Sequence, residues 1–327
     1  MLTTESPLRD ALRLVVWYPL RWLLLALPIS AGLFVLRRMG DMHYLASRGK
    51  KAHLARCLAN LRPGLAPKDM RRAVRSSFHI HYIHQLSIFL FPKFNADPAG
   101  QIGRYIEFSG LEHLDAAIRD KRGAVVVLGH HGPTQAPLAA LGAMGYPVKQ
   151  IGYPSDEGLS RIGRSVAFRL RLAYEGKIRA EIVRPGSDLR GLMRHLKAGG
   201  LVMTLGDGEG AGRRFGKFAP FPFFGHAVEF PLGPARLAVK SGARLLPMHI
   251  EPGRTASFRA VIGAPLEPPR DADSPDAKVL ALTAAFLDVF SQAVRENPGW
   301  WHFLERFHPG GMLAPSANRP APPDRDS

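Results

Sequence analysis

Residues Ala124 to Gln135 read AVVVLGHHGPTQ, and this stretch decides the fold. Its first five residues, Ala124 to Leu128, form the apolar, β-branched run that is typical of a strand buried on both faces of a sheet. Two glycines and a proline follow, so the chain is expected to turn directly after this strand. Open α/β sheets place their functional groups at the carboxyl ends of strands, which is where His130 lies.

Outward from this turn, strand-like and helical patterns alternate. Helices are predicted over residues 137–144, 159–174, 188–197, 232–240 and 277–296, and strands within 145–153 and over 182–184, 201–205, 245–250 and 257–262. This alternation predicts a three-layer α/β domain with a largely parallel sheet over residues 101–308. A helical region is expected before it over 41–100. The stretch 309–327, rich in Pro, Ala, Ser and Asp, is expected to be disordered.

The N-terminal part, residues 1–40, is predicted to be a membrane anchor. Leu14 to Leu36 is long enough to cross a hydrocarbon core of roughly 30 Å, and Arg21 is its only charged residue. Pro19 and Pro28 would kink such a helix, so a kinked span and an interfacial helix both fit. A cleaved signal peptide is a third reading, which the missing A-x-A-like site disfavours.

The formal net charge of the 327 residues is +17, which indicates a polyanionic partner. No nucleic-acid-binding motif is present and the basic residues are spread along the chain, so we expect a membrane and no nucleic acid. Arg and Lys are more frequent after the apolar segment than before it, which predicts a main body facing the cytoplasm. The single cysteine, Cys57, allows no internal disulfide and fits no zinc spacing.

His130 has the position and chemistry of a general base, because neutral imidazole can take the proton of an alcohol near pH 7. The alternative is a turn histidine that only hydrogen-bonds the backbone. Four further stretches help to decide between them: LKAGGLVMTLGDGEG at 196–210, FPFFG at 221–225, GPARLAVKSGARLLPMHI at 233–250 and ENPGWWHFLERF at 296–307.

In this order, the five blocks resemble the lipid A biosynthesis acyltransferases, a branch of the lysophospholipid acyltransferase superfamily. The resemblance extends to about residue 308. It implies transfer of a fatty acyl chain from acyl carrier protein, or coenzyme A, to a hydroxyl of a membrane glycolipid such as a lipid A precursor, at the bacterial inner membrane. It implies no metal and no redox cofactor. An acidic carrier protein would complement the +17 charge.

The chain departs from the family's pattern at Gln135, where the His-x-Gly-x-x-Glu or Asp turn ends on a carboxylate. A carboxylate fixes the imidazole tautomer and stabilises the imidazolium, whereas a glutamine carbonyl accepts a hydrogen bond but carries no charge. Three outcomes stay open: Asp207 or Glu209 replaces the carboxylate, Gln135 suffices for a slower reaction, or the chain binds lipid without turnover.

Other residues are candidates for binding substrate. Arg213 and Arg214 follow the glycine-rich loop 206–212 and could hold phosphate, and backbone N–H groups of this loop or of the His130 turn could hold an oxyanion. Arginines on the helix over 159–174 could bind lipid phosphate or carrier protein, or form a solvated face; they are Arg161, Arg164, Arg169 and Arg171. Phe223 and Gly225 of the FPFFG stretch are further substrate-binding candidates. The aromatic residues of this region could line an acyl channel, enter the bilayer or pack in the core.

Overall fold

The computed structural model describes residues 6–152, 154–208 and 214–313. Its centre is a seven-stranded sheet of order β1-β9-β8-β2-β5-β3-β4, in which all neighbours are parallel except β8 and β9. The strands are β1 (Ile106–Ser109), β2 (Ala124–Leu128), β3 (Val148–Ile151), β4 (Glu181–Val183), β5 (Leu201–Leu205), β8 (Arg244–Pro252) and β9 (Phe258–Ile262). The predicted α/β class with a largely parallel sheet is confirmed.

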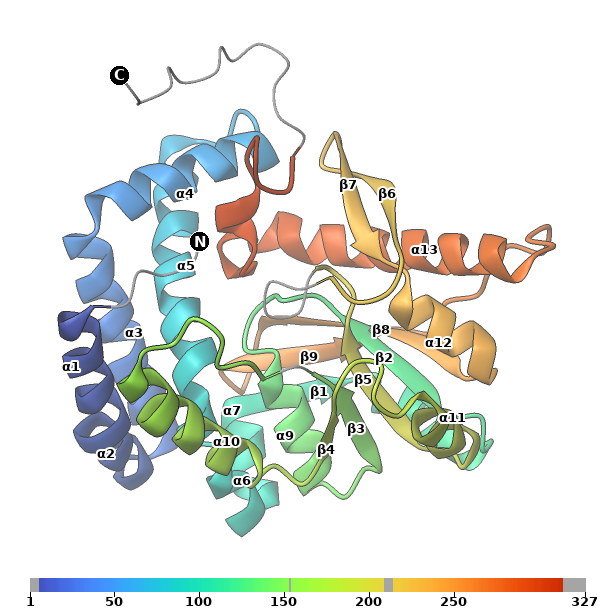
Figure 1. Ribbon diagram of the computed structural model, residues 1–327, viewed down its shortest axis with the longest axis horizontal. Helices are drawn as coiled ribbons and strands as arrows, with labels where there is room; N and C mark the ends of the chain where they lie inside the picture. The colour runs from blue at the N-terminus through green and yellow to red at the C-terminus, as the bar shows by residue number, and fades with distance from the viewer. Residues whose placement is uncertain (1–5, 153, 209–213, 314–327) are drawn as a thin grey trace.

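Helices cover both faces of this sheet, so the domain has three layers (Figure 1). On β2, Val126 packs on one face with Leu114 of α8, while Val125 packs on the other face with Leu196 of α11 and Phe286 of α13. All five residues of β2 are buried, which is why the strand is uniformly apolar. The covering helices are α8 (Leu111–Arg119), α9 (Gln135–Ala143), α11 (Leu189–Lys197), α12 (Gly233–Ser241) and α13 (Pro275–Glu296).

The N-terminal apolar segment does not form one straight helix. Leu27 has an extended backbone with ψ 148°, because the residue before a proline avoids the helical region, and a new helix begins after Pro28. Leu24 and Leu33, on either side of this break, are buried in the same core as one face of the sheet. The helices of this part are α1 (Pro7–Val15), the π-helix η1 (Val16–Leu20), α2 (Arg21–Ala26) and α3 (Ile29–Ala46).

Among the described residues, α13 alone is long and apolar enough to cross a membrane by length and composition. One side of α13 is buried against the sheet through Leu282, Phe286 and Phe290. The helix therefore has a packing role that accounts for its apolar character.

The remaining elements connect the N-terminal helices to the sheet and close the domain. They are α4 (Arg48–Leu61), α5 (Pro67–Leu86), η2 (Ser87–Phe89), α6 (Pro92–Ala96), η3 (Pro98–Ile102), α7 (Gly103–Tyr105), η4 (Gly163–Phe168), α10 (Arg169–Glu175), η5 (Pro298–Trp300) and η6 (Leu304–Arg306). In Figure 1, the helical segment of η4 and α10 lies near α1, and η4 contacts α1. Just before η4, Ser160 accepts a hydrogen bond of 3.1 Å from Arg13 of α1. A separate antiparallel hairpin, β6 (Phe218–Phe223) and β7 (His226–Pro231), lies above α13.

Candidate active site

The register of two central strands brings His130 next to Asp207. Strand β2 runs parallel to β5 with Leu128 opposite Leu205, and each of the two polar residues comes two positions after its strand ends. Gly129 lets the turn after β2 pack closely on α13, because a Cβ there would lie 2.0 Å from the ring of Phe290. The sheet itself therefore positions the pair.

Asp207 holds His130 through two hydrogen bonds. Its Oδ1 lies 2.7 Å from Nδ1 of the imidazole, and its Oδ2 accepts the backbone N–H of His130 at 2.8 Å. A third donor, the indole Nε1 of Trp301, bonds Oδ2 at 3.0 Å. With Nδ1–H donated to the carboxylate, Nε2 of the ring is left to accept a proton.

The electrostatics of the pair favour an ionised carboxylate. Asp207 is fully buried, and burial alone would raise its pKa. The positive potential of His130 and the hydrogen bonds from His130 and Trp301 outweigh burial and hold the pKa of Asp207 below its usual value. The His130 side chain is 19% exposed, so the imidazole is accessible while its partner is not.

The neighbouring histidine, His131, points the other way. It is 2% exposed, and its Nε2 hydrogen-bonds the backbone carbonyl of Asn297 at 2.9 Å. Burial lowers the pKa of His131 to about 4, so this ring is neutral at pH 7. The structure therefore distinguishes the two adjacent histidines: His130 faces the cavity, and His131 packs against the C-terminal segment.

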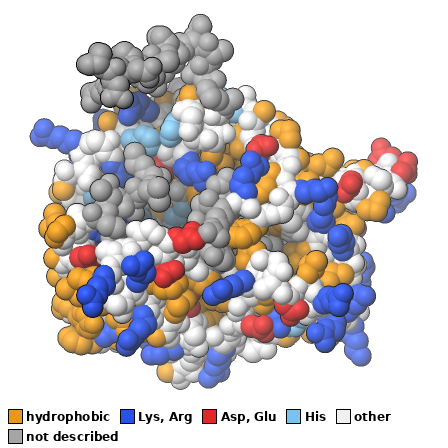
Figure 2. Space-filling model, in the orientation of Figure 1, with side chains coloured by type: hydrophobic (Ala, Val, Ile, Leu, Met, Phe, Trp, Pro, Cys, Tyr) orange, Lys and Arg blue, Asp and Glu red, His pale blue; other side chains and the backbone are white. Residues whose placement is uncertain are grey.

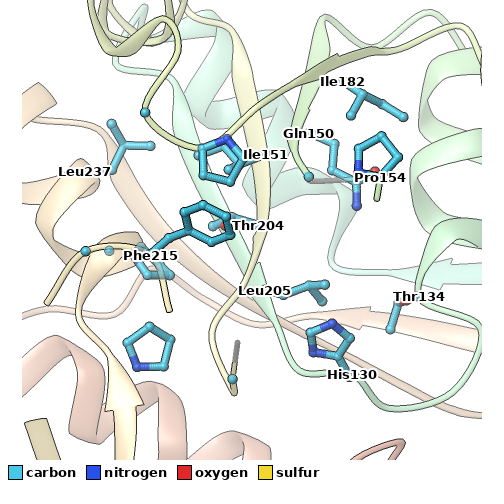
Figure 3. A pocket seen from close by; sticks show the side chains of 18 of the residues that line it. His130, Thr134, Gln150, Ile151, Pro154, Ile182, Thr204, Leu205, Phe215 and Leu237 are labelled. Atoms are coloured by element: carbon cyan, nitrogen blue, oxygen red, sulfur yellow. The ribbon is translucent and has the colours of Figure 1, made fainter. Parts of the chain in front are cut away.

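His130 lines a cavity of about 590 Å³. Figure 3 shows His130 and Thr134 on one wall of this cavity, with Phe215 and Leu237 opposite. The apolar part of the lining includes Ile151, Ile182, Leu189, Leu205, Phe215 and Leu237. Its charged residues are Arg171, Glu175, Lys217, Arg236 and Lys240. A cavity with a large apolar surface and a few polar groups is the usual form of a site for a small molecule or cofactor.

Gln135 begins α9 and lines the same cavity, but the ring N–H of His130 is not directed to it. Its side-chain amide donates to Oε1 of Glu175 at 3.3 Å, and the same oxygen accepts from Nε of Arg171 at 2.8 Å. The hypothesis that the Gln135 carbonyl accepts a hydrogen bond from the imidazole is therefore wrong. The acceptor of the ring N–H is Asp207.

The other predicted residues lie in different places. Arg171 lines the cavity, whereas Arg169 is exposed outside its lining. Arg214 pairs with Glu229 at 2.8 Å and lies over the ring of Phe218. Glu209 and Arg213 lie outside the described residues.

The FPFFG motif forms the tip of the β6–β7 hairpin and not a wall of the cavity. Phe224 and Gly225 both have positive φ, as the two central residues of a tight hairpin turn require. Phe223 is 2% exposed and packs on the rings of Phe290 and Trp301, so it belongs to the core and not to an acyl channel. By contrast, Phe215 lines the cavity.

Backbone N–H groups of the His130 turn are already engaged. The N–H of His131 donates to Gly129, that of Gly132 to Trp300, and that of His130 to Asp207. The prediction that this turn supplies an oxyanion hole is therefore wrong for these three donors. Within the described ranges, no three His, Cys, Asp or Glu side chains gather in a way that could hold a metal ion.

Sequence reasoning missed several polar cavity residues: Glu175, His84, Lys217, Arg236 and Lys240. Glu175 and His84 are contributed by helices that are distant in sequence from His130, namely α10 and α5. Glu175 is the one acidic residue in α10, which offered a weak signal. Trp301 lies in the quoted ENPGWWHFLERF block, but no local pattern indicates that its indole reaches Asp207.

Comparison with known proteins identifies the family of the chain. A family model described as bacterial lipid A biosynthesis acyltransferase matches residues 6–308. A phosphatidylinositol mannoside acyltransferase of Mycobacterium tuberculosis is 30% identical over 268 residues, which cover 80% of this chain and 78% of the relative. Its counterpart in Mycolicibacterium smegmatis is 28% identical over 267 residues, or 80% and 81% of the two chains. The chain belongs to the bacterial lipid A biosynthesis acyltransferase family, whose members are acyltransferases of the lipid A and glycolipid type.

Proposed function

We propose that this protein transfers a fatty acyl chain from a thioester donor to a hydroxyl of a membrane glycolipid, with His130 as the general base and Asp207 as the residue that orients it. The observation that carries this proposal is the 2.7 Å contact of Nδ1 with a fully buried carboxylate, on an imidazole that also lines the cavity. In a serine-protease triad, an aspartate orients the histidine that takes the proton of the serine hydroxyl. Here Asp207 and His130 would have these two roles, and the acceptor hydroxyl would take the role of the serine.

The reaction follows from this geometry. Nε2 of His130 takes the proton of the acceptor hydroxyl, whose oxygen attacks the thioester carbonyl. The tetrahedral intermediate collapses, the carbon–sulfur bond breaks, and the leaving thiolate receives the proton from the imidazolium, so the base is restored. Two donors on the cavity wall, the Thr134 hydroxyl and the Gly208 amide, are the candidates to hold the oxyanion.

The donor is proposed to enter over the cationic part of the cavity. Lys217, Arg236 and Lys240 line it there and would complement a phosphopantetheine phosphate, which acyl carrier protein and coenzyme A share. The net charge of +17 further favours an acidic carrier protein as a partner. Figure 2 shows Lys and Arg side chains distributed over much of the visible face.

The acceptor is proposed to reach the cavity from the surface of the inner membrane, on its cytoplasmic side. Large apolar side chains are exposed on the N-terminal helices: Leu8, Leu12, Leu14, Val15, Tyr18, Trp22, Leu23 and Phe34. In Figure 2, hydrophobic side chains gather at the left edge, where Figure 1 places α1 and α2. The guanidinium of Arg21 lies 5.7 Å from the rings of both Tyr18 and Trp22, a combination suited to an interfacial helix.

The test is product identification with the purified full chain in lipid nanodiscs. Palmitoyl-coenzyme A and palmitoyl-acyl carrier protein are each supplied with a phosphatidylinositol mannoside or a lipid A precursor, and mass spectrometry detects the added acyl chain. His130→Gln should lower the rate at least about 10³-fold, whereas His113→Gln on α8, outside the cavity lining, should not. Lipid bound without any acylated product would favour a non-catalytic lipid-binding relative, the alternative that Gln135 raises.

A further inference from the structure

A buried carboxylate on the cavity wall has no part in the proposed proton transfer. Glu175, the last residue of α10, is 6% exposed and lines the same cavity as His130. One oxygen, Oε1, accepts from Arg171 and from Gln135. In the described part of the chain, no hydrogen bond to its second oxygen is present. Burying a carboxylate is costly, and the hydrogen bonds from Arg171 and Gln135 offset that cost at Oε1 alone, which leaves Oε2 able to accept from a ligand.

This carboxylate is hydrogen-bonded to residue 135, the position at which the turn of the resembled family carries a Glu or Asp. Here that position holds Gln135, whose amide nitrogen is 3.3 Å from Oε1 of Glu175. The amide donates toward the glutamate, which leaves the Gln135 carbonyl as an acceptor. The cavity thus keeps an acidic group near the His130 turn, but α10 supplies it instead of α9.

A neutral imidazole lines the cavity as well. The His84 ring lies 4.1 Å from that of His302, and its buried Nδ1 has no hydrogen-bond partner among the described residues. Burial, and next the positive potentials of His302, Arg171 and His130, keep the pKa of His84 well below its ordinary value. A neutral imidazole offers one donor and one acceptor to a ligand.

Together these side chains offer both acceptors and donors, and a hydroxyl group needs both. The carboxylate and the amide carbonyl accept, while the guanidinium donates. A phosphate at the same place would be repelled by Glu175, whereas the Lys217, Arg236 and Lys240 part of the cavity would attract it. The chemistry therefore separates a hydroxyl-binding part of the cavity from an anion-binding part.

We propose that Glu175, with Gln135 and Arg171, forms a subsite that binds the polyhydroxylated sugar of the acceptor and positions the reacting hydroxyl at His130. This inference rests on the proposed function and adds a positioning residue to it. Residue 135 is a glutamine here, and α10 supplies a carboxylate beside it.

The test measures binding without turnover, so its failure is distinct from a failure of His130 catalysis. The probes are octyl α-mannoside and tetraethylene glycol monooctyl ether, which keeps the octyl chain and lacks the vicinal hydroxyls. The full chain should bind the mannoside at least about tenfold more tightly than the ether. Glu175→Gln should reduce this ratio to below about threefold and leave ether binding unchanged. Glu181→Gln, on the exposed Lys149–Glu181 pair, is the matched control.

A variant in which the carboxylate is moved from residue 175 to residue 135 shows whether the charge or the particular side chain is needed. The double variant Gln135→Glu/Glu175→Gln returns the charge to α9 and should recover most of the mannoside preference. A purely structural role for Glu175 would lower the melting temperature without changing the ratio between the two probes. If Glu175→Gln fails to fold, Arg171→Gln should show the same loss of preference. Wild-type protein without a mannoside preference, or a Glu175→Gln variant that keeps it, would overturn the proposal.

Discussion

Replacing Asp207 by asparagine tests whether the charge of Asp207 is needed for His130 to act as a base; the two residues are called the dyad below. The substitution keeps the shape of the side chain and removes its charge. An asparagine has one acceptor oxygen, while the carboxylate serves three donors: the backbone N–H of His130, its ring Nδ1 and the indole of Trp301. If the oxygen stays with the two fixed donors, the NH₂ group faces Nδ1. The imidazole must then carry its proton on Nε2 and can no longer act as a base.

The size of the effect follows from the lost charge. An imidazolium about 4 Å from a carboxylate gains about 4 kcal/mol at an effective dielectric constant of 20. Since each 1.4 kcal/mol changes a rate about tenfold, the expected loss is about 10³-fold. The same exchange in the serine-protease triad lowers kcat about 10⁴-fold, so Asp207→Asn is expected to fall between these two values.

The assay is steady-state acyl transfer from palmitoyl-coenzyme A to phosphatidylinositol mannoside, with circular dichroism to confirm folding. Asp115→Asn is the matched control, because Asp115, on α8, accepts an exposed hydrogen bond from the Tyr146 hydroxyl and does not line the cavity. It should react at the wild-type rate. A folded Asp207→Asn variant that keeps more than a tenth of the wild-type kcat would refute the assigned role.

Three further predictions concern the support of the site. Gly129→Ala places a Cβ 2.0 Å from the Phe290 ring and should destabilise the fold by about 1–3 kcal/mol, seen as a lower melting temperature; an unchanged value would contradict the close approach. Trp301→Phe removes the indole donor to Asp207 and should cost about 1–2 kcal/mol in urea unfolding together with a partial loss of kcat, whereas wild-type kcat would show that the third bond is dispensable. Burial lowers the pKa of His131 to about 4, so the unfolded chain binds a proton below pH 6.5 that the native state does not, and the free energy of unfolding should fall as the pH drops from about 6.5 toward 4. Burial lowers the pKa of other histidines as well, that of His302 also to about 4, so His131→Gln should reduce this slope without removing it. Equal slopes for both proteins would rule out a contribution of His131.

Local patterns predicted the central strands well. The expected ranges Ala124–Leu128 and Leu201–Leu205 coincide with β2 and β5, because a short β-branched run between glycines has few alternatives. Asp207 was one of two candidate carboxylates, because it lies on the loop after the predicted strand 201–205, as His130 lies on the turn after 124–128. Their direct contact required the register, which no local pattern contains.

Other features depend on contacts between distant segments. The hairpin β6–β7 is rich in Phe and Pro, and its two strands pair with each other. Its sequence therefore does not indicate which other element Phe223 contacts, so core packing and an acyl channel fitted equally well. The break at Leu27–Pro28 agrees with the kink expected at Pro28, but the burial of Leu24 and Leu33 in the core of the domain could not be predicted from the apolar run alone. Glu175 reaches the cavity only because α10 packs near α9, about forty residues away along the chain.

The most direct test of the central claim is a double-mutant cycle on the dyad. The values of kcat are measured for wild type, His130→Gln, Asp207→Asn and the double variant with the same thioester and acceptor. If Asp207 acts only through His130, the double variant should be as slow as His130→Gln alone, because residues that work as a unit are not additive. A double variant whose loss equals the product of the two single losses would show that Asp207 acts independently, and would contradict the account.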